Sequence, residues 1–267
     1  MTEKYNIFIE GIPGSGKTTL LNTLAECLPH YNTYREGDIS PVDLAWCAYM
    51  NEGQYKKALV DMAELSNEIQ EKTIGEKANF ITAYTKIITE QHQFYKYMEQ
   101  YEIYGGRRDP LEFQRIIFQR FDDFHSYGNI FECSFFQNII EELMLFTEFS
   151  DEQIVGFYKE LIARLDMSKF KLIRLVPNDI KSCIKTIKCE RRNEKGEETW
   201  YQSMISYLSD SPFGKAHGIS NFEDMITHFK RRTELESKVI KLLPGRCCFT
   251  IQSKKYEADG ILRALNE

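Results

Sequence analysis

The chain has 267 residues, of which 42% are hydrophobic and 28% charged, as in an ordinary globular protein that can bury a sizeable core. The formal net charge of −6 produces a field that repels nucleic acid and anionic membranes, so we expect neither as a partner. No apolar run approaches membrane-spanning length and no signal-peptide pattern opens the sequence. We therefore expect a cytoplasmic protein.

A stretch near the start of the chain predicts a nucleotide-binding loop. An apolar run of β-formers, residues 6–10, enters a glycine-rich turn, and a helical pattern follows over residues 17–28. Strand, loop and helix in this order, with the sequence Gly-Ile-Pro-Gly-Ser-Gly-Lys-Thr, are the pattern of a phosphate-binding P-loop. The residues that we expect to bind a nucleoside triphosphate are Gly11, Gly14, Ser15, Gly16, Lys17, Thr18 and Thr19.

The residue types in this loop suit phosphate chemistry. The glycines let backbone N–H groups approach phosphate oxygens, and the following helix directs its positive end at the same anion. Lys17 supplies a mobile positive charge for the β- and γ-phosphates, and the Thr18 hydroxyl can ligate Mg²⁺. We therefore expect ATP and Mg²⁺ as cofactors, although the sequence does not distinguish ATP from GTP.

A second strand is predicted over residues 31–35, with carboxylates just beyond its end. Glu36 and Asp38 follow this strand, and ligands of open α/β sheets gather at that edge, on the same side as the P-loop. Both are therefore candidate bases for a substrate hydroxyl. The alternative is that they cap a turn or a helix, which suits Asp38 especially.

The middle of the chain has a mostly helical pattern. Apolar residues recur at helical spacing over residues 42–104, with a break at residues 74–76. Gly105 and Gly106 end this stretch, and a helix over residues 111–124 begins next to a proline and carries Gln114.

An acidic residue at the end of a strand and a group of basic residues at the end of a helix are the main features of the second half of the chain. The apolar strand over residues 129–134 carries Glu132 near its end, where P-loop enzymes need a carboxylate for Mg²⁺ or its waters. Further strands are predicted over residues 170–176 and 247–251. Between them, a helix from residue 180 ends in basic residues and leads into a charged loop, which suits a lid that closes over phosphates. A solvated charged surface is the alternative for that loop.

The order of these features resembles the deoxynucleoside kinases, a branch of the P-loop kinases with thymidylate kinases as near relatives. Glu10-Gly11 resembles the opening of their glycine loop. Arg35-Glu36 and the downstream Trp46 are similar to their glutamate-plus-tryptophan segment, and Phe113-Gln114 to their Phe-Gln. Further similarity lies in Glu132-Cys133-Ser134, which stands where the family has Glu-Arg-Ser, and in the lid cations Lys188, Arg191 and Arg192.

The resemblance implies a fold and a set of roles. The fold is a three-layer α/β P-loop kinase with a parallel sheet flanked by helices, a helical insertion at about 50–106 and a lid at about 188–200, forming a single domain over residues 1–267. Glu36 would be the catalytic base, and Lys17, Arg191 and Arg192 would act on the transferring phosphate. Trp46, Gln114 and Glu132 would contact the substrate, and Thr18 and Glu132 the metal.

The sequence also departs from the family. Cys133 replaces the family's arginine, so a cation near the reacting phosphate is missing or comes from elsewhere. The tyrosine-rich segment before residue 104 is longer than expected and can resize the acceptor pocket. Its role, the identity of the acceptor and the oligomeric state, with a homodimer among the options, are left open.

The leading expectation is a kinase that transfers the γ-phosphoryl group of ATP to a nucleoside or nucleoside-like small molecule. The alternatives are a nucleoside monophosphate kinase and a kinase of another metabolite or of an antibiotic. A nucleotide-binding protein or an ATPase without a small-molecule acceptor is the alternative from another class. A GTPase is disfavoured because residues 193–196 lack the aspartate of the guanine-binding motif.

Overall fold

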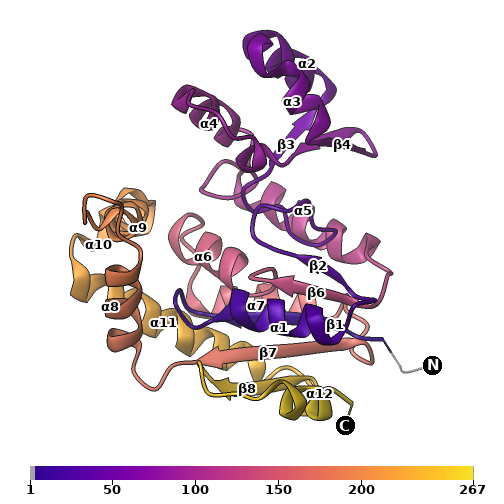
Figure 1. The fold of residues 1–267 in the computed structure, drawn as a ribbon, viewed down its shortest axis with the longest axis vertical. Coiled ribbons are helices and arrows are strands. Elements are labelled where there is room, and N and C mark those ends of the chain that lie inside the picture. Colours follow the sequence, from indigo (N-terminus) through magenta and orange to yellow (C-terminus); the bar gives the residue numbers. More distant parts are fainter. Residues whose placement is uncertain (1–3, 267) are drawn as a thin grey trace. The chain divides into compact units, whose positions relative to one another are not determined.

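The computed structural model describes residues 4–266 and divides the chain into two compact units (Figure 1). The first unit combines the described residues up to Thr33 with those from His125 onward, and the second is Tyr34–Phe124. The first unit is thus built from two separate stretches of the sequence. Within residues 4–266, no helix is both long enough and apolar enough to cross a membrane.

A five-stranded parallel sheet forms the centre of the first unit, with the order β2-β6-β1-β7-β8. β1 pairs in parallel with β6 on one side and with β7 on the other. The chain therefore moves to one side of β1 for β2 and β6, and to the other for β7 and β8. This order puts the loop after β1 at the point of reversal, where open α/β sheets bind ligands. The strands are β1 (Asn6–Gly11), β2 (Asn32–Tyr34), β6 (Asn129–Glu132), β7 (Phe170–Val176) and β8 (Cys248–Gln252).

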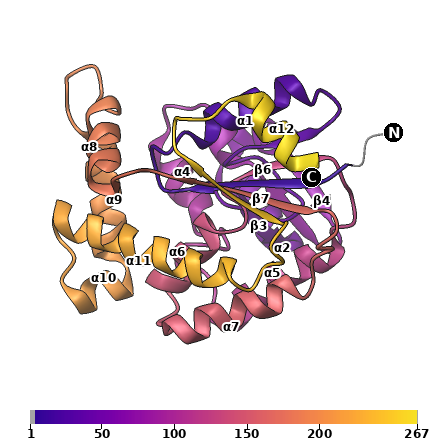
Figure 2. The same ribbon diagram turned by 90° about the horizontal axis from the view of Figure 1, so that it is seen from below.

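Helices cover both faces of this sheet, so the first unit has three layers, as the sequence predicts (Figure 2). On one face, α1 and α12 pack over aliphatic residues of the strands, including Ile7 and Ile9. The other face, below which α6, α7 and α11 lie, is aromatic: the rings of Phe8 and Phe131 stack with centroids 4.8 Å apart. Both faces of β1 are buried, which explains the continuous apolar run at its centre, residues 7–9. The helices of this unit are α1 (Lys17–Cys27), α6 (Gln137–Leu145), α7 (Asp151–Ile162), α8 (Ile180–Glu190), α9 (Thr199–Asp210), α10 (Pro212–His217), α11 (Phe222–Ile240) and α12 (Ala258–Asn266).

The second unit contains a small sheet that the sequence did not predict. Its antiparallel strands have the order β3-β5-β4, and β4 and β5 form a hairpin in which Glu76 pairs with Asn79. The mostly helical pattern of residues 42–104 did not indicate these strands, which the structure adds to the expected helical insertion. Each strand has only four residues, which is too short for alternation to be distinguished from a helical pattern. The strands are β3 (Ala48–Asn51), β4 (Thr73–Glu76) and β5 (Asn79–Thr82).

Helices make up most of the rest of the second unit. The last of them begins as the sequence predicts, because Asp109 caps it by accepting hydrogen bonds from two backbone N–H groups and Pro110 occupies its first turn. A separate hydrophobic core joins β3 to the helices α2, α3 and α4. The helices are α2 (Glu52–Asp61), α3 (Ser66–Glu71), α4 (His92–Glu99) and α5 (Pro110–Asp123), with 3-10 turns at Ala63–Leu65 and Tyr84–Lys86.

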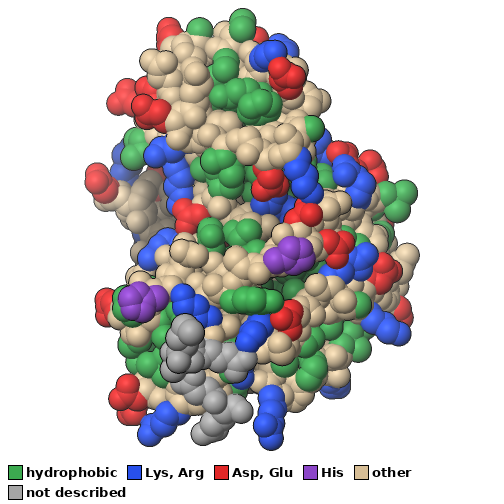
Figure 3. Space-filling model, turned by 90° about the vertical axis from the view of Figure 1, so that its right-hand side faces the viewer, with side chains coloured by type: hydrophobic (Ala, Val, Ile, Leu, Met, Phe, Trp, Pro, Cys, Tyr) green, Lys and Arg blue, Asp and Glu red, His purple; other side chains and the backbone are tan. Residues whose placement is uncertain are grey.

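The face of the molecule drawn in Figure 3 is mixed in charge. On the face drawn in Figure 3, lysines and arginines are interspersed with aspartates and glutamates, and hydrophobic side chains occur in small groups. No broad basic area gathers on this face, in keeping with the net charge of −6.

Candidate active site

The loop between β1 and α1 has the backbone conformation that its glycines predict. Gly11, Gly14 and Gly16 have φ angles of 155°, 79° and 95°, a range that side-chain-bearing residues rarely adopt. A Cβ atom on Gly11 would lie 2.6 Å from the Ser15 Oγ and 2.7 Å from the Leu175 carbonyl oxygen. Only glycine fits at that position. The loop can therefore follow the path that brings its N–H groups toward an anion at the start of α1.

Lys17 is buried and is held by its own loop. Its Nζ donates hydrogen bonds to the carbonyl oxygens of Gly11 at 2.9 Å and Ile12 at 3.3 Å. The neighbouring Ser15 hydroxyl is also buried, and among the described residues it has no hydrogen-bond partner. A buried polar group of this kind calls for a partner, and a phosphate oxygen would supply one. The loop therefore fits a phosphate group.

Thr18 and Glu132 meet at the carboxyl edge of the sheet. The Thr18 Oγ1 donates a hydrogen bond of 2.5 Å to Oε1 of Glu132. Among the described residues, no group of three or more His, Cys, Asp or Glu side chains could enclose a metal ion. A hydroxyl and one carboxylate nevertheless suit Mg²⁺, which takes few protein ligands and keeps waters and substrate phosphates for the rest. The pair that the sequence assigns to the metal is thus brought together and fits Mg²⁺.

The loop after β6 is fixed by a buried carboxylate. Glu10 accepts hydrogen bonds from the backbone N–H groups of Phe135 at 2.7 Å and Gln137 at 3.0 Å, at the start of α6. Burial raises the pKa of Glu10 to about 7, against the opposing effect of these N–H groups and of Arg232. Cys133, in the same loop, is buried with a φ angle of 65°. Glu10 therefore connects the P-loop strand to the loop that follows Glu132.

This raised pKa predicts a pH dependence of stability. The proton on Glu10 stabilises the fold fully below its ordinary pKa near 4.5, and this contribution is lost as the pH rises through about 7. We expect that this pH-dependent change in the free energy of unfolding, on the order of 1–3 kcal/mol, is absent in Glu10→Gln. Unfolding by urea between pH 4.5 and 8 measures it. If the free energy of unfolding of the variant depended on pH as that of the wild type does, the assignment to Glu10 would be contradicted.

Glu141 serves as the control, because its expected pH dependence has the opposite sign. Burial alone would raise its pKa, but His228 and Arg232 hold that pKa down at about 2. Its contribution to stability is therefore present above about pH 4.5 and is lost only as the pH falls toward 2. Glu141→Gln should consequently remove a contribution to the free energy of unfolding that the wild type loses only below about pH 4.5.

The basic end of α8 lies on the same unit as the P-loop. The Cys183 thiol lies 3.6 Å from the Pro13 carbonyl oxygen, so α8 packs directly on the loop. At the end of this helix, Lys188 and Arg192 both pair with Glu198, at 3.0 and 2.8 Å. Arg191 is exposed at the C-cap, and the structure shows no side-chain partner for it among residues 4–266. The predicted lid cations Lys188, Arg191 and Arg192 thus lie at the end of α8 and the start of the loop that follows it.

The remaining predicted residues belong to the second unit. Glu36 is exposed in a turn after β2. Trp46 is half exposed at 50%, with a φ angle of 64°. Gln114 is half-buried on α5, and among the described residues its amide makes no hydrogen bond. Asp38 accepts a hydrogen bond from the Arg35 N–H at 2.7 Å and pairs with Lys86 at 3.1 Å, so it caps this turn.

The charged residues beneath the P-loop were not predicted from the sequence. Arg232, on α11, is buried and donates a hydrogen bond to the Gly11 carbonyl oxygen at 3.2 Å. Its other partners are Glu141 and Glu236, at 3.0 Å each. A buried arginine in a helix with many charged residues has no recognisable pattern, and only the three-dimensional structure shows that it contacts the loop.

Comparisons with known proteins show a remote likeness to solved structures. No family model matches the chain, and no curated protein matches it. A solved structure of a deoxyadenosine kinase from M. mycoides with bound dATP is similar to it with a TM-score of 0.37 and 14% sequence identity. The match covers 98% of this chain and 100% of that chain. Likeness at this level leaves the function to be argued from the residues of the chain itself.

Proposed function

We propose that this protein is a small-molecule kinase that transfers the γ-phosphoryl group of ATP to a hydroxyl of a nucleoside or nucleoside-like acceptor. The observation that carries the proposal is the geometry after β1: a glycine loop, a buried Lys17 and the Thr18–Glu132 pair occupy the reversal point of a parallel sheet. Each of these features suits the phosphates of a nucleotide or its Mg²⁺.

In the proposed reaction, the acceptor oxygen forms a bond to the γ-phosphorus while the bond from this phosphorus to the β-bridging oxygen breaks, so that ADP leaves. Lys17 and the N–H groups of the loop stabilise the charge that develops on the phosphate oxygens. Glu36 accepts the proton of the acceptor hydroxyl. Trp46 and Gln114 are the proposed contacts to the acceptor, because they correspond to the family's segments. Mg²⁺, held by Thr18 and Glu132, would neutralise phosphate charge when bound.

The two units are proposed to act as one kinase chain, with residues 50–106 as an insertion and residues 188–200 as the lid. Lid cations that meet the phosphoryl group mainly in the transition state contribute to kcat and little to ground-state binding. Arg191 and Arg192 stand at the end of α8, which packs on the P-loop through Cys183.

We therefore expect that Arg191→Ala and Arg192→Ala lower kcat on the order of 10²-fold, with a smaller change in KM for ATP. Steady-state kinetics at varied ATP measure both constants. Lys185→Ala is the matched control, because Lys185 is an exposed cation on the same helix, and it should leave both constants unchanged. If both arginine variants kept the wild-type kcat, the loop would be a solvated charged surface and not a lid.

Nucleotide binding can be tested separately from turnover. A ligand that binds only the folded protein stabilises it by mass action, by about 2.7 kcal/mol at a hundredfold excess over Kd. Melting temperatures measured with ATP, GTP, nucleosides and nucleoside monophosphates, each with Mg²⁺, should rise with a triphosphate and with an acceptor. A nucleoside that stabilises would favour the proposed reaction, and a monophosphate the monophosphate kinase. No shift with any nucleotide would overturn the proposal.

A further inference from the structure

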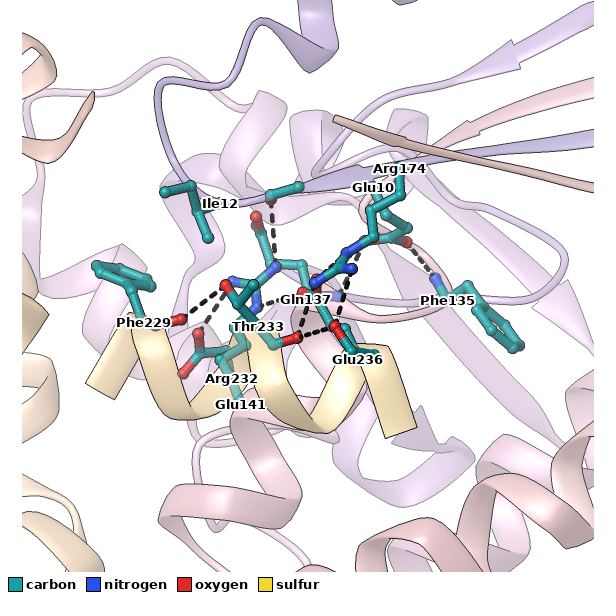
Figure 4. Close-up of polar contacts among 12 residues, drawn as sticks. Glu10, Ile12, Phe135, Gln137, Glu141, Arg174, Phe229, Arg232, Thr233 and Glu236 are labelled. Atoms are coloured by element: carbon teal, nitrogen blue, oxygen red, sulfur yellow. Dashed lines mark hydrogen bonds and ion pairs between the residues drawn. The ribbon is translucent and has the colours of Figure 1, made fainter. Parts of the chain in front are cut away.

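A cluster of charged side chains lies buried against the P-loop strand (Figure 4). Its members come from four elements, β1, α6, β7 and α11, and all of them except Glu10 are joined to another member by an ion pair. This buried charge cluster consists of Glu10, Glu141, Arg174, His228, Arg232 and Glu236. Charges removed from water are costly unless they are paired, so the cluster fixes the relative position of these elements.

Arg232 is the member that reaches the loop. It is 1% exposed, and its guanidinium donates to three acceptors. The Nε and one terminal nitrogen contact Glu236 and Glu141, at 3.0 Å each. The other terminal nitrogen donates to the Gly11 carbonyl oxygen at 3.2 Å. The planar fork of an arginine can serve three acceptors in fixed directions, which a lysine ammonium at the end of a flexible stem cannot do equally well.

The Gly11 carbonyl oxygen is shared by two cations. Arg232 approaches it from α11, and Lys17 donates to the same oxygen at 2.9 Å. If Lys17 turns toward the phosphates of a nucleotide, it gives up this acceptor. A buried carbonyl left without a donor is unfavourable, but here Arg232 still donates to it. The release of Lys17 therefore leaves no unpaired oxygen at Gly11.

We propose that Arg232 is a positioning residue for nucleotide binding: it holds the Gly11 carbonyl from beneath the loop, so that Lys17 is free to move to the phosphates. This inference rests on the proposed function, because it concerns the nucleotide bound by the same loop. Glu141 and Glu236 fix the guanidinium, and His228, whose Nε2 lies 2.7 Å from Glu141, extends the support.

Arg174 provides a matched control within the cluster. It pairs with Glu236 at 2.9 Å and also donates to the Thr233 carbonyl and the Ser237 hydroxyl, so all the hydrogen bonds that the structure shows for its guanidinium go to α11. Replacing either arginine by lysine makes the same chemical change in the same buried cluster. Only Arg232→Lys alters a contact to the P-loop.

The test compares Arg232→Lys with Arg174→Lys in the full chain. The Kd for ADP with Mg²⁺ is measured by titration calorimetry, and the melting temperature is measured without nucleotide. We expect both variants to lose thermal stability, but only Arg232→Lys to bind ADP about tenfold more weakly than the wild type. Equal affinities in the two variants would overturn the positioning role and leave Arg232 a stabilising residue.

The outcomes separate this inference from the proposed function. If the wild type binds neither ADP nor GDP, the proposed function fails, and the inference fails with it. If the wild type binds and Arg232→Lys binds equally well, the inference alone fails. Should Arg232→Lys not fold, the double variant Arg232→Gln/Glu141→Gln replaces the ion pair by amides, with Glu141→Gln as its control. Of these two variants, only the double variant, which lacks Arg232, is expected to bind ADP more weakly.

Discussion

Lys17→Ala is expected to lower turnover on the order of 10²–10³-fold or more, without unfolding the protein. The charge of Lys17 would stabilise the phosphoryl group as it moves between oxygens, and truncation to alanine removes this charge from a buried position. Among residues 4–266, its hydrogen bonds go only to the carbonyl oxygens of Gly11 and Ile12, so few contacts are lost when it is truncated.

Steady-state rates and a melting curve of this variant are the required measurements. A melting temperature close to that of the wild type would show that the loss of rate comes from the site. Turnover near the wild-type level would mean that Lys17 does not act on phosphate, and the function proposed for the loop would be lost.

Glu36→Gln is expected to lower kcat on the order of 10²–10⁴-fold, with a much smaller change in the affinity for the acceptor. The substitution preserves size and hydrogen-bonding capacity but removes the base. Glu36 is exposed in the turn after β2, where it can take part in chemistry without a structural role in the core. If the acceptor is a phosphate, as for a monophosphate kinase, no base is needed and the loss should be small.

Asp38→Asn is the control for this variant, because Asp38 lies two residues further along the same turn. Its carboxylate accepts a hydrogen bond from the Arg35 N–H and pairs with Lys86. An asparagine oxygen can still cap the turn, so kcat should change little. A large loss of kcat in Asp38→Asn together with an unaffected Glu36→Gln would reverse the assignment of the base.

The sequence predicted best where the chemistry depends on neighbouring residues. The P-loop is contiguous, and its glycines have the positive φ angles that such a turn requires. The five strands of the parallel sheet were also predicted, because each is a short run of strand-forming residues bounded by turns or helices. The meeting of Thr18 with Glu132 follows from the parallel pairing of β1 and β6, which puts both residues at the same edge.

What the sequence could not predict depends on contacts between distant segments. The partners of Arg232 are 221, 91 and 4 residues away, and only the last of these has a spacing that a helical pattern reveals. The sheet of the second unit was missed because its four-residue strands lie among helices and contain residues such as Gly75 that favour neither structure. The role of Asp38 remained open in the sequence, since capping residues and catalytic carboxylates have the same composition.

The release of ADP from ATP and Mg²⁺, measured with and without a panel of nucleosides, tests the central claim most directly. Lys17→Ala, assayed in parallel, shows that the activity belongs to this protein. A small-molecule kinase releases ADP only when its acceptor is present, in an amount equal to that of the phosphorylated nucleoside, and this is the predicted result. ADP release that does not depend on any acceptor would indicate an ATPase, and no release with any nucleoside would indicate a nucleotide-binding protein; either outcome would contradict the proposed nucleoside kinase.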